Sequence, residues 1–290
     1  MNVGIVGLGV MGGNHKRVYE KLGHNVTDIY DPFVFPGQTL GSFIDSCHRN
    51  NVLGISICNP SDQHVDTSLQ ILQKIPEIYL LIEKPVSLEV EEAKKLLPYK
   101  NRILVGHIEQ FNRGVVKLRE WIDGGEFGKI FSIRTKRVNN IPSREPIKNV
   151  ATDLLVHDIE VVNSLIGLEP TFSKVIKKST NDNHIYDHAH AILQYDDIVC
   201  YCEVNWISPV KERYLEIYYA QGFIRLDYST QTITFVGHQG NTLELLSNKE
   251  YQEPLMNEIK HFTNLIESDI QPKVLVNTSI NVLEIINEDF

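Results

Sequence analysis

The sequence predicts an α/β protein of two domains, the first built on a parallel sheet and the second on an antiparallel one. Up to about residue 107, short apolar runs alternate with amphipathic stretches, which is typical of strands joined by crossover helices. After residue 128, strand-like runs follow one another closely, and two-residue links join several of them, which indicates hairpins. We therefore place the first domain at 1–107 and the second at 108–290.

The elements follow from the hydrophobic pattern. The strands expected in the first domain are 3–7, 26–31, 53–59, 79–84 and 102–107. Those expected in the second domain are 129–138, 188–195, 198–207, 214–220 and 223–228, with Asp196-Asp197 and Gln221-Gly222 as hairpin links. Apolar residues at helical spacing predict helices over 150–166, 254–267 and 277–287.

The composition narrows the classes of partner. The chain has 290 residues, of which 42% are apolar, so it can bury a sizeable core. Its net charge of −9 argues against binding to nucleic acids or to a membrane surface, because both need a basic footprint. No window approaches the roughly 20 apolar residues of a membrane helix, and the four cysteines show no disulfide framework and no C-x-x-C spacing. We expect a cytoplasmic protein whose partners are small molecules or other subunits.

A glycine-rich turn follows the first expected strand. Gly7, Gly9 and Gly12 form the pattern G-x-G-x-x-G between a strand and a helix. The first glycine permits a tight turn, the second lets a pyrophosphate approach the backbone, and the third allows the helix to pack closely on the strand. The phosphates then lie at the positive end of the helix. The pattern predicts a dinucleotide-binding domain, and a glycine turn without a ligand is the alternative.

Asp31 ends the next expected strand, at the distance from the glycines that a ribose-binding carboxylate has. A carboxylate at this position accepts hydrogen bonds from a ribose 2′-hydroxyl and repels a 2′-phosphate. Pro32 and Phe33 supply no compensating cation. The sequence therefore favours NAD over NADP as the cofactor.

Lys84 ends the fourth expected strand, between Glu83 and Pro85. In an open parallel sheet, ligands gather beyond the carboxyl ends of the strands, so Lys84 lies where a nicotinamide and a substrate would meet. A solvated lysine explains the position equally well.

Asp153 and His157 lie four residues apart in the expected helix over 150–166. This spacing puts both polar side chains on one face of a largely buried helix. Three interpretations are open: a hydrogen-bonded pair in the core, two ligands of a metal ion, or part of an active site. Because no spacing in the chain completes a recognisable zinc site, we predict no metal.

Six motifs occur in the order found in the Gfo/Idh/MocA oxidoreductases, and the chain resembles that family over nearly its whole length. They are GLGVMGGNHKRVY, NPSDQH (59–64), EKPV (83–86), VGHIEQFN (105–112), GKI (128–130) and the D-x-x-x-H of 153–157. The resemblance implies a Rossmann domain followed by an α/β domain with an open, mainly antiparallel sheet, whose outer face often forms dimer or tetramer contacts. It also implies a cis Lys84–Pro85 peptide and a homodimer or homotetramer.

The resemblance implies three catalytic residues. Oxidation of a secondary alcohol needs a proton acceptor, for which His157 is suited because imidazole ordinarily titrates near neutral pH. Lys84 would stabilise the developing alkoxide charge. Asp153 would hold a neighbouring hydroxyl or orient the other two. The cofactor-binding residues implied by the motifs are Gly7, Gly9, Val10, Met11, Gly12, Asp31, Asn59, Pro60, His64, Glu83 and Lys84.

The second half most resembles the branch that acts on nucleotide sugars, such as UDP-N-acetylglucosamine 3-dehydrogenases. The chain departs from that branch at Gln110, where arginine is usual. The cations suited to a diphosphate or to sugar hydroxyls are Arg137, Arg144, Lys211 and Arg213, although each is equally well explained as a solvated surface charge. The leading hypothesis is an NAD-dependent oxidoreductase acting on a secondary hydroxyl of a sugar or nucleotide sugar. The alternatives are an NAD-dependent glycosidase and a non-catalytic dinucleotide-binding regulator.

Overall fold

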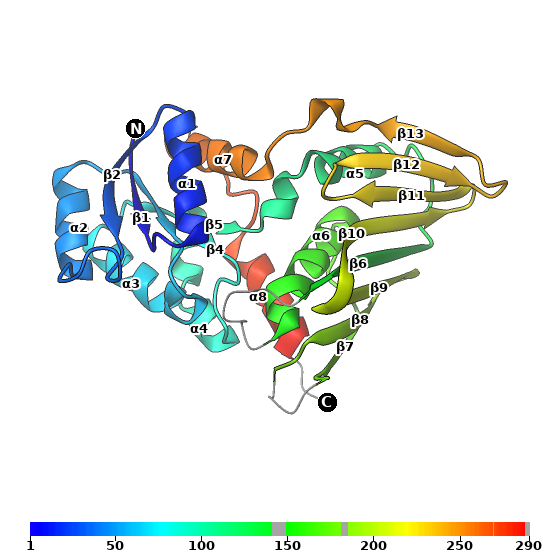
Figure 1. The fold of residues 1–290 in the computed structure, drawn as a ribbon, viewed down its shortest axis with the longest axis horizontal. Helices are drawn as coiled ribbons and strands as arrows, with labels where there is room; N and C mark the ends of the chain where they lie inside the picture. The colour runs from blue at the N-terminus through cyan, green and yellow to red at the C-terminus, as the bar shows by residue number, and fades with distance from the viewer. Residues whose placement is uncertain (141–148, 181–184, 269, 288–290) are drawn as a thin grey trace. The chain divides into compact units, whose positions relative to one another are not determined.

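The chain forms two compact units (Figure 1). The computed structural model describes residues 1–140, 149–180, 185–268 and 270–287. Unit 1 comprises Met1–Ile108 and Pro254–Asn281, and unit 2 comprises Glu109–Glu253 and Val282–Phe290. Among the described residues, no helix combines the length and the apolar character that crossing a membrane requires.

Unit 1 is built on a parallel sheet with the strand order β2-β1-β3-β4-β5. Its strands are β1 (Asn2–Val6), β2 (Asn25–Tyr30), β3 (Gly54–Ile57), β4 (Tyr79–Glu83) and β5 (Ile103–Gly106). All four pairings are parallel, which confirms the five predicted strands. The order reverses between β1 and β3, and this switch point is where open α/β sheets bind ligands.

Helices from two distant parts of the chain cover this sheet. They are α1 (Val10–Lys21), α2 (Leu40–Arg49), α3 (His64–Lys74), α4 (Val90–Lys94), α7 (Pro254–Ser268) and the first part of α8 (Val276–Asn287). A Cβ atom on Gly54 would lie 2.6 Å from Ile266 and 2.9 Å from Phe262, so α7 packs closely on β3. We expected the whole of 108–290 to form the second domain, but α7 and the start of α8 pack within unit 1 because their apolar faces complete its core.

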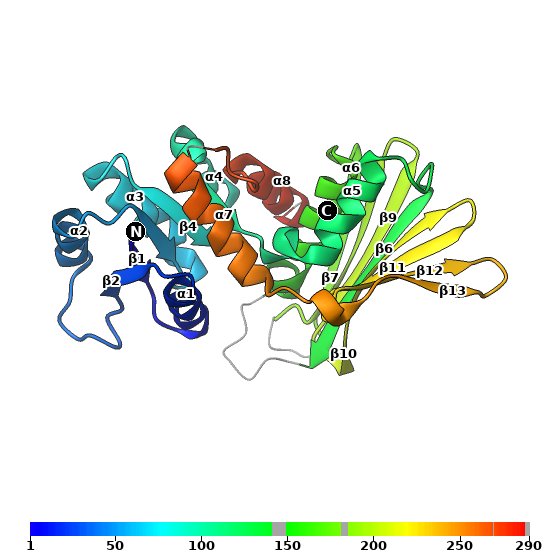
Figure 2. The same ribbon diagram turned by 90° about the horizontal axis from the view of Figure 1, so that it is seen from above.

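Unit 2 is built on an eight-stranded sheet with the order β13-β12-β11-β10-β6-β9-β8-β7. The strands are β6 (Ser132–Asn140), β7 (Phe172–Lys178), β8 (His188–Tyr195), β9 (Ile198–Asn205), β10 (Ile207–Tyr219), β11 (Gly222–Asp227), β12 (Thr232–Gly237) and β13 (Thr242–Leu246). Only β6 and β9 pair in parallel, and the other pairs are antiparallel, which confirms a mainly antiparallel sheet. Helices α5 (Arg113–Asp123) and α6 (Val156–Ile166) cover one face of it (Figure 2).

The core of unit 2 lies between these helices and alternate residues of the strands. Leu118 of α5 and Val162 of α6 belong to the same buried cluster as Cys202 of β9 and Leu215 of β10. Because successive strand residues point to opposite faces, the residues between them face away from the helices. The sheet therefore has one apolar, covered face and one face turned outward.

The sequence pattern did not reveal three strands of this sheet. β7 is an edge strand rich in lysine and serine, and β12 and β13 form an outer hairpin that is only partly buried. β7 and β13 are the edge strands of the sheet, and β12 lies between β11 and β13. The side chains of all three strands are mostly exposed or only partly buried. Hydrophobic alternation alone therefore missed them.

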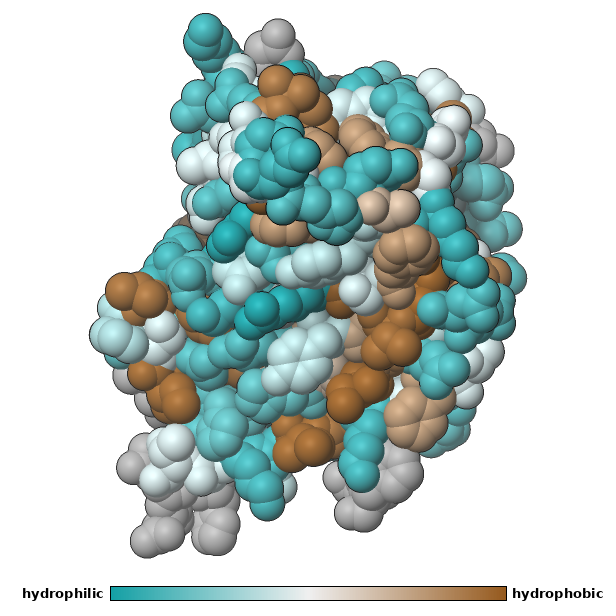
Figure 3. Space-filling model, turned by 90° about the vertical axis from the view of Figure 1, so that its right-hand side faces the viewer, coloured by the Kyte–Doolittle hydropathy of each residue, from teal (hydrophilic) through white to brown (hydrophobic). Residues whose placement is uncertain are grey.

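The outward face of the sheet carries exposed apolar side chains (Figure 3). Ile192 on β8 is directly opposite Tyr201 on β9, and Val199 lies two residues earlier on that strand. These side chains are 41%, 39% and 47% exposed, respectively. Phe131, which precedes β6, is 50% exposed. The outward face is therefore apolar to a degree that solvated sheet faces usually avoid.

Candidate functional site

The glycine turn at the end of β1 depends on close backbone approaches. Gly7 has a φ of +84°, and a Cβ atom there would lie 2.6 Å from the backbone nitrogen of Asn59. A Cβ atom on Gly12 would lie 1.8 Å from the carbonyl oxygen of Gly7. At Gly9 a Cβ atom would meet nothing within 4 Å. The first and third glycines are thus needed for packing inside unit 1, whereas Gly9 leaves open space above the turn.

Helix α1 begins at this open space. Gly9 is its N-cap and supplies no side-chain cap, so the first-turn N–H groups, those of Val10, Met11 and Gly12, are donors without an intrahelical acceptor. Val10 is 81% exposed. Backbone donors and the positive end of the helix dipole together suit an anion such as a pyrophosphate. The residues present therefore fit a dinucleotide.

Asp31 lies directly after β2 and is held by backbone donors. The N–H of Leu8 donates to Oδ2 at 2.7 Å, and the N–H groups of Phe33 and Val34 donate to Oδ1 at 2.9 and 3.1 Å. Burial alone would raise the pKa of Asp31, but these three hydrogen bonds outweigh it and lower the pKa. A carboxylate therefore stands beside the glycine turn at neutral pH.

His64 connects the segments that follow β3 and β4. Its Nε2 lies 2.9 Å from the carbonyl oxygen of Asn59, and its Nδ1 lies 2.9 Å from that of Pro85. The Asn59 side chain donates to the hydroxyl of Thr67 at 3.0 Å. The Lys84–Pro85 peptide is cis, as predicted. Pro60, beside Asn59, is exposed. Because His64 contacts both Asn59 and Pro85, it joins the two segments at the carboxyl ends of their strands.

Glu83 and Lys84 have different surroundings. The Glu83 carboxylate is buried and lies 2.9 Å from Nε2 of His15 in α1. Lys84 is half-buried. Burial and the nearby positive charge of Lys84 lower the pKa of His107 to about 3. His107 was not among the predicted site residues, although the motif VGHIEQFN contains it.

Asp153 and His157 lie at a junction between two helical geometries in unit 2. Residues Ala151–Leu155 form a π-helical turn, and α6 starts at Val156. The predicted single helix over 150–166 is therefore wound more widely in its first turn. Single π-turns inserted into helices are frequent at functional sites. Asp153 is 5% exposed and His157 is 9% exposed.

Asn149 anchors the start of this turn. Its Oδ1 accepts from the N–H of Ala151 at 2.9 Å, and its carbonyl oxygen accepts from the Thr152 hydroxyl at 2.9 Å and from the Asp153 N–H at 3.3 Å. One residue thus satisfies donors at the beginning of the helix.

Arg137 lies in a buried ion-pair cluster beside this helix. Its guanidinium donates to Glu109 Oε1 at 2.9 Å and, through Nε and Nη2, to Asp158 Oδ1 at 3.2 and 3.1 Å. It also lies 4.8 Å from the ring centre of Tyr228. Burial alone would lower the pKa of Arg137, but the two carboxylates outweigh it and raise the pKa, so the side chain stays charged.

This cluster changes the interpretation of Arg137. The sequence suggested a substrate-binding cation, yet the side chain is 1% exposed and its donors point to two carboxylates. Because Asp158 directly follows His157, the ion pair holds the helix that carries His157. Strand alternation could not reveal this, since Val138 beside Arg137 is also buried.

The other predicted substrate cations differ in burial. Arg213 is directly opposite Arg137 in the pairing of β10 with β6 and is partly buried. Burial and the charge of Arg137 lower the pKa of Arg213, and Asp153 is among the acids that oppose this shift. Lys211 is exposed on β10. Arg144 lies outside the described residues.

Gln110 is buried at the start of unit 2. Its amide nitrogen donates to the Glu160 carboxylate. Its amide oxygen accepts from the Ser164 hydroxyl at 2.8 Å and from Arg119 Nη2 at 3.0 Å. The residue that departs from the nucleotide-sugar pattern therefore joins α5 and α6 within the unit.

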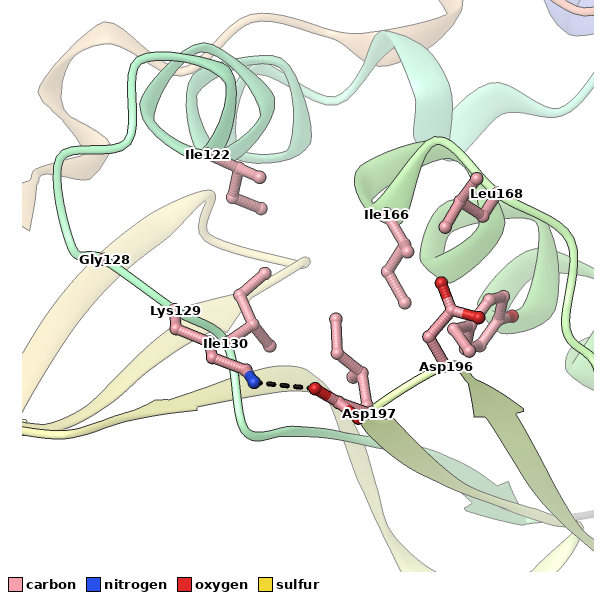
Figure 4. Close-up of a pocket in the computed structure, with 10 residues that line it drawn as sticks. Ile122, Gly128, Lys129, Ile130, Ile166, Leu168, Asp196 and Asp197 are labelled. Atoms are coloured by element: carbon pink, nitrogen blue, oxygen red, sulfur yellow. Dashed lines mark hydrogen bonds and ion pairs between the residues drawn. The ribbon is translucent and has the colours of Figure 1, made fainter.

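A surface cavity of about 320 Å³ lies elsewhere in unit 2 (Figure 4). Isoleucines line much of it, and Lys129 and Asp197 form an ion pair of 2.8 Å at its edge. None of the predicted site residues lines it. Because both members of the ion pair are largely exposed, we assign the cavity no chemical role.

Comparison with known proteins identifies two family profiles. Residues 1–102 match the oxidoreductase family with an NAD-binding Rossmann fold, and residues 115–225 match the GFO/IDH/MocA C-terminal domain. The inositol 2-dehydrogenase of Rhizobium meliloti (strain 1021) is 28% identical over 153 residues, which are 48% of this chain and 46% of that protein. The chain thus matches about half the length of this curated relative.

Solved structures share the fold. The UDP-N-acetylglucosamine 3-dehydrogenase of Acidithiobacillus ferrooxidans superposes with a TM-score of 0.83 at 20% identity, covering 98% of this chain and 94% of that one. An oxidoreductase from Agrobacterium radiobacter, solved in complex with NAD+, L-tartaric acid and magnesium, gives a TM-score of 0.82 at 13% identity, with coverage of 99% and 94%. At these identities the likeness concerns the fold.

Removing the Arg137 side chain should destabilise the protein strongly. An Arg137→Ala variant leaves Glu109 and Asp158 as buried carboxylates without a cation, and loss of one partner from such a cluster costs about 3–5 kcal/mol. Lys249→Ala, at an exposed position elsewhere in unit 2, should change stability by no more than about 0.5 kcal/mol. Denaturant unfolding followed by circular dichroism measures both, and equal stability of the two variants would contradict the structural role of the cluster.

Proposed function

Because the chain belongs to the Gfo/Idh/MocA oxidoreductase family, we propose that it is an NAD-dependent dehydrogenase acting on a secondary hydroxyl of a sugar or nucleotide sugar. Two observations carry the proposal: unit 1 has a dinucleotide-binding turn, and unit 2 has a buried acid and imidazole at a π-helical junction. A sensor of dinucleotides would need the first feature but not the second. The relatives' names support this substrate class, since they are an inositol and a UDP-sugar dehydrogenase.

We assign proton transfer to His157 and charge stabilisation to Lys84. A nicotinamide cofactor held by the glycine turn of unit 1 would supply the hydride acceptor. His157 takes the proton from the substrate hydroxyl, and the Lys84 ammonium donates a hydrogen bond to the same oxygen. Asp153 orients a neighbouring hydroxyl. Asp158, held by Arg137, fixes the turn on which His157 lies.

We assign cofactor binding to the glycine turn and its neighbours. The N–H groups of Val10, Met11 and Gly12 receive the pyrophosphate above Gly7 and Gly9. Residues that follow the other strand ends complete this set: Asp31, Asn59, Pro60, His64 and Lys84. The carboxylate of Glu83 is in contact with His15. We therefore propose that Glu83 contributes to cofactor binding only through its backbone. For the substrate we retain Lys211 and Arg213, and Arg144 as a proposal from the sequence.

The substrate class can be tested by following NADH formation against free sugars, polyols, and UDP- and GDP-sugars. We expect turnover on at least one polyol, sugar or nucleotide sugar, and His157→Ala should lower that turnover about 100- to 10,000-fold, the usual contribution of a general base. NADH binding, measured by fluorescence, should change little. The matched control is His238→Ala, because His238 is an exposed histidine in the turn directly after β12.

Unchanged turnover in His157→Ala would remove the general-base assignment. Absence of NADH formation on the entire panel, together with hydrolysis of a nitrophenyl glycoside, would replace the dehydrogenase by a glycosidase. Absence of both reactions with intact NADH binding would favour a regulator.

The preference for NAD should depend on Asp31. Its lowered pKa keeps the side chain charged at neutral pH, and residues 32–38 contain no lysine or arginine. Asp31→Ala should therefore shift the ratio of NADPH to NADH affinity by about tenfold or more toward NADPH, equivalent to about 1.4 kcal/mol. Titration of intrinsic fluorescence with each cofactor measures the ratio. Asp45→Asn, exposed on α2, is the control, and a ratio unaltered in Asp31→Ala would show that Asp31 does not select the cofactor.

We further propose that a second copy of the chain covers the outward face of the unit 2 sheet, giving a homodimer or homotetramer. The exposed Ile192, Val199 and Tyr201 support this, because an isolated sheet face is usually polar. Tyr201→Glu should shift the mass measured by light scattering toward a monomer. Leu53→Asp, at an exposed apolar position of unit 1, should leave the mass unchanged. A wild-type protein that is monomeric at all concentrations would refute the proposal.

A further inference from the structure

We propose that His15, Glu83 and Glu258 form a binding site for one divalent transition-metal ion, with Zn²⁺ as the expected occupant, inside unit 1. The three residues belong to α1, β4 and α7. One ligand atom from each lies within 4.8 Å of the other two, and all three side chains are buried. The proposal is independent of the proposed reaction, because it assigns the ion no contact with a substrate.

The donor set suits a transition metal. Imidazole nitrogens and carboxylate oxygens are both ligands of zinc, and they occur together in three-residue zinc sites. His15 Nε2 and Glu83 Oε1 are 2.9 Å apart. Two tetrahedral donors about 2.0–2.2 Å from one ion are roughly 3.3–3.6 Å apart, so these two side chains would move apart slightly on binding. A small movement of Glu258 within the 4.8 Å limit would complete the set.

Glu258 is the observation that requires a ligand. Its side chain is fully buried, and neither carboxylate oxygen has a hydrogen-bond partner among the described residues. A buried polar group without a partner costs about 1–3 kcal/mol, and more if it is charged. A metal ion would satisfy both needs of this carboxylate, since it supplies a partner and a positive charge.

Among the described residues, no cation forms a hydrogen bond with Glu258. Burial raises the pKa of Glu258 above its ordinary value, and the nearby charge of Glu83 raises it further. Burial also raises the pKa of the Cys58 thiol, and Glu83 and Glu258 add to that shift, so we do not count this thiol among the ligands. Two carboxylates around one imidazole carry a formal charge that a divalent ion balances.

His15 is oriented as metal-binding histidines are. Its Nδ1 lies 3.0 Å from the Ser56 hydroxyl, which in turn lies 2.9 Å from the Tyr19 hydroxyl. When Nδ1 donates its hydrogen to Ser56, the lone pair of Nε2 points to the two carboxylates. An outer hydrogen bond of this kind fixes the tautomer and the ring direction of a ligating imidazole.

Protons alone satisfy the cluster less well. A protonated Glu258 would be neutral, yet neither of its oxygens has a hydrogen-bond partner in the arrangement of the described residues. The ion would also join α7 to α1 and β4, two elements that precede it in the chain by more than 170 residues. The expected role is therefore structural.

The test measures metal content in tag-free protein expressed in zinc-supplemented and zinc-depleted media. We expect about one equivalent of zinc per chain from the supplemented medium, by mass spectrometry of the metal, and a higher Tm for that sample. Glu258→Gln keeps the shape of the side chain but loses its charge, and should retain no more than about a tenth of an equivalent. His15→Gln, which can still bond to Ser56, should lose the metal in the same way.

Glu267→Gln is the matched control, because Glu267 is exposed on the same helix. It should bind zinc as the wild type does. The proposal is overturned if wild-type protein carries no zinc from either medium, or if folded Glu258→Gln and His15→Gln variants carry as much as the wild type. It is also overturned if Glu258→Gln has a higher Tm than the wild type by the same amount in both media. Loss of the negative charge of Glu258 would then stabilise the cluster without any metal. If one variant fails to fold, as judged by circular dichroism, the other decides.

Discussion

The close approach of the first glycine turn to its neighbours is the constraint on which unit 1 depends. Gly7 touches the backbone after β3, and Gly12 touches the backbone of Gly7. No side chain fits in either contact, so the start of α1 packs directly against the sheet at its switch point. Three features therefore lie at the same edge of the sheet: the first-turn N–H groups of α1, the carboxylate of Asp31 and the turn after β3. The same contacts give the domain its core packing and leave its ligand-binding edge open.

Patterns in the sequence predicted the parts of the fold that rest on periodic burial. Strands β1, β3, β4 and β5 follow from short apolar runs, because parallel strands are buried on both faces. Strand β2 was also predicted, although it lies at the edge of the sheet and is mostly not buried. The glycine turn and the cis peptide followed from local motifs. What failed was everything decided by distant contacts. The return of α7 to unit 1 depends on its fit against Gly54, which no local pattern reveals.

The candidate site shows the same division. Asp153 and His157 could be recognised because they interrupt an apolar helix. The π-helical turn Ala151–Leu155, which contains Asp153, could not be recognised. Arg137 was predicted to bind the substrate, with a solvated surface charge as the alternative, because arginine is usually exposed. Its burial becomes understandable only with Glu109, 28 residues earlier, and Asp158, 21 residues later. The carboxylates of Glu109 and Asp158 are thus balanced by Arg137, whereas Glu258 of unit 1 has no hydrogen-bond partner among the described residues.

The division of unit 1 between two chain segments bears on how the protein is made. Synthesis proceeds from the N-terminus, so residues 1–108 leave the ribosome long before Phe262 and Ile266 exist. Until then, the surface of β3 at Gly54 has no helix to cover it. Unit 2, apart from its short C-terminal segment, is completed earlier, since its main part ends at Glu253. The core of unit 2 also waits for Val282, Ile285 and Ile286, which follow the last segment of unit 1. Each unit therefore reaches its final packing only after the C-terminal helices have been made, so the usual order, in which the N-terminal domain matures first, does not hold for this chain.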